Sequence, residues 1–153
     1  MKICWYKDEE IGIFFDEIPD VSIRYSNHLS TKEEIEDINL KPFILNKDLY
    51  VYLDNHLKEE NFSFFVPMSY KWDGASIPRF FWRLIGSKTD TRFLIPSLVH
   101  DVLCENHDYV DGDRYFSTIV FERLLYVSNV NPFSRWLIKH SVDNYQKFCN
   151  WEN

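Results

Sequence analysis

A chain of 153 residues, of which 45% are hydrophobic and 18% aromatic, is long enough for a sizeable core, and we expect one domain over residues 1–153. The 24 acidic residues outnumber 17 basic ones, and a net charge of −7 disfavours binding to a nucleic-acid backbone. Three cysteines without CxxC spacing argue against a disulfide framework or a zinc ribbon. No apolar run approaches the roughly 18 residues of a membrane span. The N-terminus turns acidic before a hydrophobic region develops, so we expect no secretory signal and synthesis in a cytoplasm.

The first half of the chain, residues 1–75, has the pattern of strands. Apolar and polar alternation, together with aromatic enrichment, predicts strands over 11–18, 21–26, 49–55 and 62–72. In the last of these, Pro67 indicates a sheet edge or a bulge. A possible capping box of Ser30 and Glu33 predicts a short helix between the strands.

The second half, residues 76–153, has helical periodicity. Proline and glycine positions together with apolar spacing predict helices over 76–86, 96–106, 113–129 and 131–151. Asp113 is expected to cap the third helix, and Asn131 to cap the fourth with Pro132 as its first residue. The predicted fold class is therefore α+β, a small antiparallel sheet packed against three to four C-terminal helices.

The turn where strands give way to helices carries the first candidate site residues, Asp73 and Ser76. A junction between two layers exposes side chains and free backbone N–H groups, which suits a binding site. On turn chemistry alone, however, a structural role is favoured, with Asp73 bonding to nearby turn amides and Ser76 capping the next helix.

A second candidate is the adjacent pair His100 and Asp101 on the predicted helix 96–106. Imidazole and carboxylate together can hold a divalent metal, or act as a base with its orienting partner. His100 and Cys104 are four residues apart on one helix face, as a thiol and its base would be, although packing is the better explanation of that cysteine. The second such pair, His107 and Asp108, falls in an expected loop.

These blocks together resemble a family of small phage and prophage proteins catalogued as a domain of unknown function. Members show a D-x-A-S-x-P-R-x-x-W block, then H-D-x-L on a helix, then R-x-x-A-D-x-x-F. The matching residues are Asp73, Ala75, Ser76, Pro78, Arg79, Trp82, His100, Asp101, Leu103, Arg114 and Phe121. The resemblance covers residues 66 to about 145, and it departs at Thr118, where the family has an acid.

The resemblance implies a phage origin and leaves two main hypotheses for function. In the first, the protein is a virion structural or assembly component of the head–tail or tail region, and its partners are other phage proteins. The polar cluster then ties sheet to helices, with Arg114 paired to Asp73 or Asp101. Thr118 favours this hypothesis, since the missing acid leaves the catalytic set incomplete.

In the alternative hypothesis, the protein is a metal-dependent hydrolase of phage lysis or cell-wall entry. Asp73, His100 and Asp101 would hold the metal or activate a water, and Ser76 with Arg114 would orient the substrate. A third interpretation is a counter-defence protein that sequesters a host nucleotide or protein. All of these place the chain in the host cytoplasm during synthesis, and the first places it later in the virion.

Overall fold

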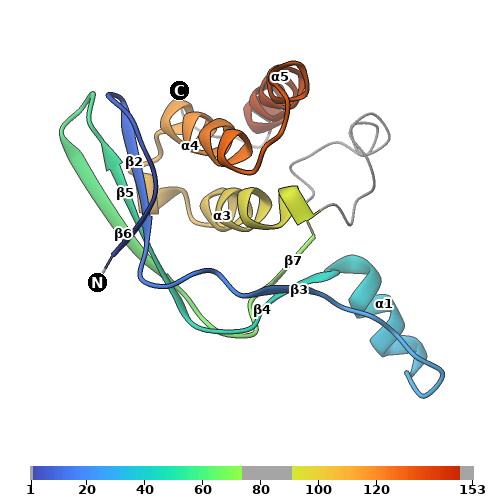
Figure 1. The fold of residues 1–153 in the computed structure, drawn as a ribbon. Helices are drawn as coiled ribbons and strands as arrows, with labels where there is room; N and C mark the ends of the chain where they lie inside the picture. The colour runs from blue at the N-terminus through green and yellow to red at the C-terminus, as the bar shows by residue number, and fades with distance from the viewer. Residues whose placement is uncertain (1, 74–90, 149–153) are drawn as a thin grey trace.

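The computed structural model describes residues 2–73 and 91–148, and it confirms the α+β class. Figure 1 shows antiparallel strands from the first half of the chain on one side and the helices of the second half against them. The helix predicted over 76–86 lies outside the described residues. No helix in the described ranges combines the length and apolar character needed to cross a membrane.

The larger sheet has four antiparallel strands in the order β1-β2-β5-β6. Their bounds are β1 (Ile3–Lys7), β2 (Ile11–Phe15), β5 (Leu49–Asn55) and β6 (Glu60–Val66). The strand predicted over 49–55 is confirmed to the residue. The prediction over 11–18 extended three residues too far, and β1 was missed because its apolar residues do not alternate cleanly.

Alternation along β5 decides which face of this sheet is covered. Leu49, Val51 and Leu53 are at most 1% exposed, whereas Tyr50 between them is 46% exposed. Successive side chains of a strand point to opposite faces, so one face of the sheet meets the core and the other meets solvent.

The smaller sheet has three antiparallel strands in the order β3-β4-β7. Their bounds are β3 (Val21–Ile23), β4 (Phe43–Leu45) and β7 (Lys71–Trp72). The single strand predicted over 62–72 was wrong, because the chain turns after Pro67 and continues in the other sheet. In that turn Ser69 has a φ of 75°, and its N–H donates to Leu45 O at 2.8 Å. The prediction over 21–26 was too long by three residues, and β4 was missed.

The helices are α1 (Lys32–Leu40), α3 (Leu94–Glu105), α4 (Arg114–Val127) and α5 (Pro132–Phe148), with 3₁₀ turns η1 (Thr91–Phe93) and η2 (His107–Val110). The predicted caps of α4 and α5 are confirmed: Asp113 accepts from the N–H of Phe116, and Asn131 accepts from the N–H of Ser134. Each cap satisfies an N–H that has no partner inside its own helix.

Three local predictions need correction. The cap of α1 is Thr31, whose hydroxyl accepts from Glu34 N–H, while the Ser30 hydroxyl accepts from Asn27 N–H in the preceding turn. Helix α3 begins at Leu94, two residues before Pro96, which is tolerated because a first-turn residue needs no N–H. The expected loop at His107 is η2, closed by an N–H···O bond from Tyr109 to Asn106.

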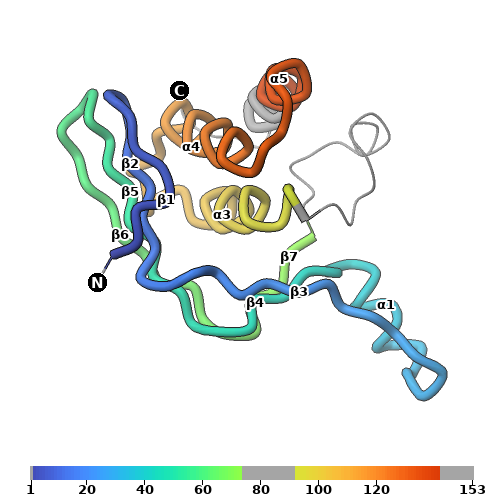
Figure 2. The backbone as a smooth tube through the Cα atoms, in the orientation of Figure 1, coloured from blue at the N-terminus to red at the C-terminus, as the bar shows by residue number. Residues whose placement is uncertain are grey.

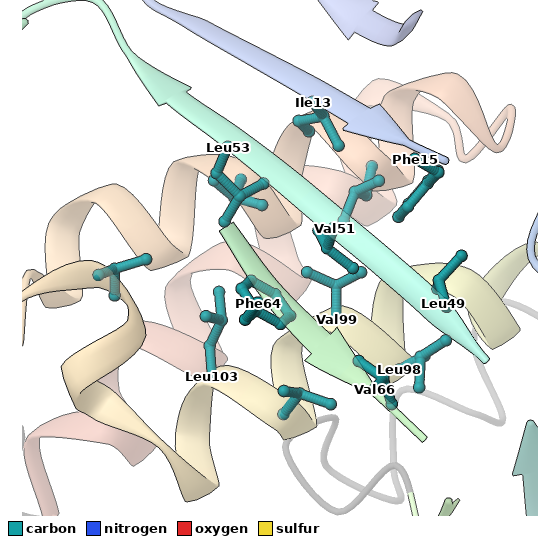
Figure 3. Packing of buried hydrophobic residues seen from close by; sticks show 14 of the residues in the cluster. Ile13, Phe15, Leu49, Val51, Leu53, Phe64, Val66, Leu98, Val99 and Leu103 are labelled. Carbon is teal, nitrogen blue, oxygen red and sulfur yellow. The ribbon is translucent and has the colours of Figure 1, made fainter. Parts of the chain in front are cut away.

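Helix α3 runs along the covered face of the larger sheet and forms the centre of the core. Figure 3 shows Leu98, Val99 and Leu103 of α3 beneath Val51 and Phe64 of the strands. Helix α4 packs on α3, and α5 packs on α4, as the tube of Figure 2 also shows. The sheet therefore fixes α3, and α3 in turn holds the candidate residues of the H-D-x-L block.

Candidate functional site

Strand β7 is fastened to helix α3 by one buried hydrogen bond. Trp72 Nε1 donates to Ser97 Oγ at 2.9 Å, and Ser97 Oγ donates to Leu94 O at 3.2 Å. Trp72 and Ser97 are each 1% exposed. Because Asp73 directly follows Trp72, this bond places the first candidate carboxylate beside α3.

Tyr70 lies at the centre of the polar groups at this junction. Its ring stacks on Trp72 with centroids 5.9 Å apart. Burial raises the pKa of Tyr70 well above its usual value, and the charges of Glu105, Asp101 and Asp73 raise it further. The buried hydroxyl has no hydrogen-bond partner of ordinary geometry in the described part of the chain, so Glu105 acts on it mainly through charge.

Ser97, Asp101 and Glu105 are spaced four residues apart, so they form one stripe along α3. Trp72 meets the start of this stripe through its hydrogen bond to Ser97.

The residues predicted for this cluster did not include Tyr70, Ser97 or Glu105. The four-residue spacing of Ser97, Asp101 and Glu105 is visible in the sequence and could have revealed the polar stripe. Nothing local indicates that the stripe faces Tyr70, since that contact depends on how β7 packs against α3.

His100 faces a different neighbourhood from Asp101. Its imidazole is 1% exposed, and its ring meets the edge of Phe121 with centroids 4.5 Å apart. Cys104 Sγ lies 3.6 Å from His100 Nδ1 on the same helix face, as expected for residues four apart. Burial lowers the pKa of His100 to about 3. Consecutive helical residues are rotated by about 100°, which separates the surroundings of this imidazole from those of the Asp101 carboxylate.

Arg114 and Thr118 lie on the first turns of α4. Arg114 is the first residue of the helix and is 8% exposed. The Thr118 hydroxyl donates to Arg114 O at 3.1 Å, a bond within its own helix. Asp113, the cap of α4, also accepts from Lys58 Nζ at 2.7 Å. Ser76 lies outside the described residues.

The metal site expected at Asp73, His100 and Asp101 stays a prediction. Within residues 2–73 and 91–148, no three His, Cys, Asp or Glu side chains group closely enough to bind a metal ion. The His100 imidazole packs against the ring of Phe121 of α4.

The fold and this junction define a class of small α+β proteins in which a polar helix stripe is packed against a short strand. The chain belongs to the family described as "Protein of unknown function (DUF1353)", whose model matches residues 49–142. The match begins earlier than the resemblance suggested, because it includes β5 and β6 and so takes in half of the larger sheet.

A curated relative is similar to part of the chain. It is "Uncharacterized protein y4jT" of Sinorhizobium fredii (strain NBRC 101917 / NGR234), 42% identical over 63 residues. The matched region is 36% of this chain and 19% of the relative, so the chain spans about a fifth of that protein's length. No solved structure matches the chain significantly.

Proposed function

We propose that the chain is a phage-encoded structural or assembly component of the head–tail or tail region, acting through contacts with other phage proteins. The observation that carries this proposal is the burial of His100. A general base works best with a pKa near the working pH and must reach its substrate. An imidazole that is 1% exposed, with a pKa lowered to about 3, meets neither requirement.

Polar residues that lie beside the signature blocks support the same role. Trp72 and Ser97 use their polar atoms to join β7 to α3, and Thr118 uses its hydroxyl within α4. Asp113 caps α4 and accepts from Lys58, a residue of the β5–β6 hairpin connection. Polar groups that are satisfied by each other specify one arrangement of sheet and helices. We infer that the signature maintains the shape that partners recognise.

Mass spectrometry of purified particles tests this proposal. The chain should copurify with particles of the phage that encodes it, at a constant ratio to a known virion protein across a density gradient. A host cytoplasmic protein of similar abundance serves as the matched control, since it should be lost in the gradient. A chain that is lost together with that control would remove the virion role.

A second candidate function, hydrolysis of a cell-wall polymer, is favoured by one observation. Asp73 follows Trp72, whose indole N–H donates to Ser97 Oγ one helical turn before Asp101, so the two carboxylates come from separate elements that are joined at this junction. Paired carboxylates are the usual means of acid–base hydrolysis of glycosidic bonds. This candidate predicts that purified chain clears a peptidoglycan suspension and that Asp101→Asn abolishes clearing without altering the circular dichroism spectrum. If wild type and Asp101→Asn give the same clearing, the carboxylates have a structural role.

A further inference from the structure

Helix α1 projects from the body of the molecule and buries none of its side chains. Figures 1 and 2 show it at the end of an excursion between β3 and β4, away from the larger sheet. Its attachment is polar: Arg24 donates to Asp37 Oδ2 at 2.7 Å and to Lys41 O at 3.0 Å. An isolated helix shorter than about 12–15 residues is marginal in water, so a nine-residue helix without buried contacts gains most from a partner.

One side of this helix combines acid and apolar groups in a line, here called the arm stripe: Glu33, Glu36 and Leu40. The spacings of three and seven residues place them on one face. Leu40 is 70% exposed. Neither glutamate forms an ion pair with any described residue. The arm stripe therefore offers a leucine beside two glutamates that form no ion pair with a described residue.

A second unpartnered face lies on the first turns of α5, here called the aromatic stripe: Phe133, Trp136 and His140. Phe133 is 68% exposed and Trp136 is 56% exposed, and the rings of Trp136 and His140 lie 4.6 Å apart. The neighbouring Lys139 makes no ion pair within the described ranges. The aromatic stripe therefore offers two large rings beside a lysine that forms no ion pair with a described residue, and its charge is opposite to that of the glutamates of the arm stripe.

We propose that the arm stripe of one copy of the chain docks on the aromatic stripe of another, with Leu40 against Trp136 and the glutamates near Lys139. Trp is among the side chains that most often anchor protein interfaces. One molecule cannot make this contact with itself, because α1 and α5 lie on opposite sides of α3 (Figure 1). Pairing of two arm stripes would place glutamate against glutamate, which opposes a symmetric dimer through α1.

Association of two different faces is head-to-tail, and it produces a ring or a filament rather than a closed twofold dimer. This deepens the proposed assembly role and rests on it for its biological setting. Because one short helix covers less than the roughly 800 Å² per partner of a standard interface, we expect association in the micromolar range or weaker.

Sedimentation velocity on the purified full chain tests the inference without reference to a phage particle. The average mass should rise with concentration between about 10 and 500 µM, where contacts of this size become populated. An arm variant, Glu36→Lys with Leu40→Ser, should remain monomeric, and so should an aromatic variant, Phe133→Ala with Trp136→Ala. Circular dichroism should be unchanged in both, because all four side chains are exposed or lie on exposed faces.

The matched control changes the other side of the same arm. Glu34→Lys with Ile35→Ser alters one charge and one apolar side chain of α1, as the arm variant does, but off the stripe. This control should associate like the wild type. Mixing the arm variant with the aromatic variant restores one complementary pair of faces, so it should give a complex of one copy of each and nothing larger.

Three results would overturn the inference: a wild-type chain that stays monomeric, a control that loses association as fully as the arm variant, or a mixture that forms no complex. Absence of the protein from virions alongside normal self-association would reject the proposed setting while leaving the contact itself in place.

Discussion

Replacing Ser97 with alanine tests the bond that joins β7 to α3. The change leaves Trp72 Nε1 buried without its acceptor, at a site where both residues are 1% exposed. An unsatisfied buried donor costs about 1–3 kcal/mol, and alanine in place of serine returns about 0.5 kcal/mol in a helix. We expect a net loss of about 1–2 kcal/mol in the free energy of unfolding, and about 2–8 °C in melting temperature for a chain of this size.

Ser117 of α4 provides the matched control. It is 0% exposed, and its hydroxyl has no hydrogen-bond partner among the residues that the structure describes. Ser117→Ala removes a buried polar group that gains nothing, so it should be neutral or stabilise the protein by up to about 1 kcal/mol. The same chemical change at two buried helix positions should therefore have opposite effects on the free energy of unfolding.

Urea unfolding followed by tryptophan fluorescence measures both variants. The slope of the free energy against urea should match the wild type in each, since neither change alters the surface exposed on unfolding. If Ser97→Ala destabilises no more than Ser117→Ala, the Trp72–Ser97 bond does not stabilise the junction, and the positioning of Asp73 needs another explanation.

Two further predictions concern pH. Because burial lowers the pKa of His100 to about 3, the unfolded chain binds a proton there between about pH 6.5 and 3 that the folded chain does not. The free energy of unfolding should therefore fall as the pH drops through that window. His100→Gln should reduce the slope of this fall by up to about 1.4 kcal/mol per pH unit, which urea titrations at each pH would measure. At Asp8, burial opposes ionisation, but hydrogen bonds from the Tyr6 hydroxyl, the Ile11 N–H and Arg123 hold its pKa below the usual range. The ionised Asp8 therefore stabilises the fold above about pH 4, and this stabilisation is lost in more acid solution. Arg123→Met should lower the free energy of unfolding by about 1–2 kcal/mol at pH 7 and by steadily less toward pH 2. A loss that does not change with pH would show that Asp8 is not the titrating group responsible.

Much of the local structure followed from the sequence. Asp113 and Asn131 were predicted as caps because a cap is a bond between a side chain and an N–H two or three residues later. Strand β5 was predicted to the residue because each of its buried positions alternates with a more exposed one. The single strand predicted over 62–72 was wrong because the turn after Pro67 is stabilised by Leu45 O, an acceptor some 24 positions away.

In the candidate site too, the local features were predicted from the sequence and the long-range contacts were not. The sequence identified Asp73 as a polar residue of the turn between strands and helices, His100 and Asp101 as an adjacent polar pair on a helix, and Arg114 as a residue that opens a helix. It did not indicate that the imidazole and the neighbouring carboxylate face different elements. The imidazole packs against Phe121 of α4, a contact that depends on long-range packing.

By itself the sequence determined the α+β class of the fold, with strands in the first half and helices in the second, and the local signals that cap the helices. These properties depend on interactions between residues a few positions apart, where spacing along the chain also gives spacing in three dimensions. The tertiary structure alone decided that the strands divide between two sheets, that α1 stands uncovered, and that His100 is buried. These features depend on which distant apolar surfaces pack together. The local sequence patterns would be the same for every other packing of the same strands and helices, so they cannot distinguish between the packings.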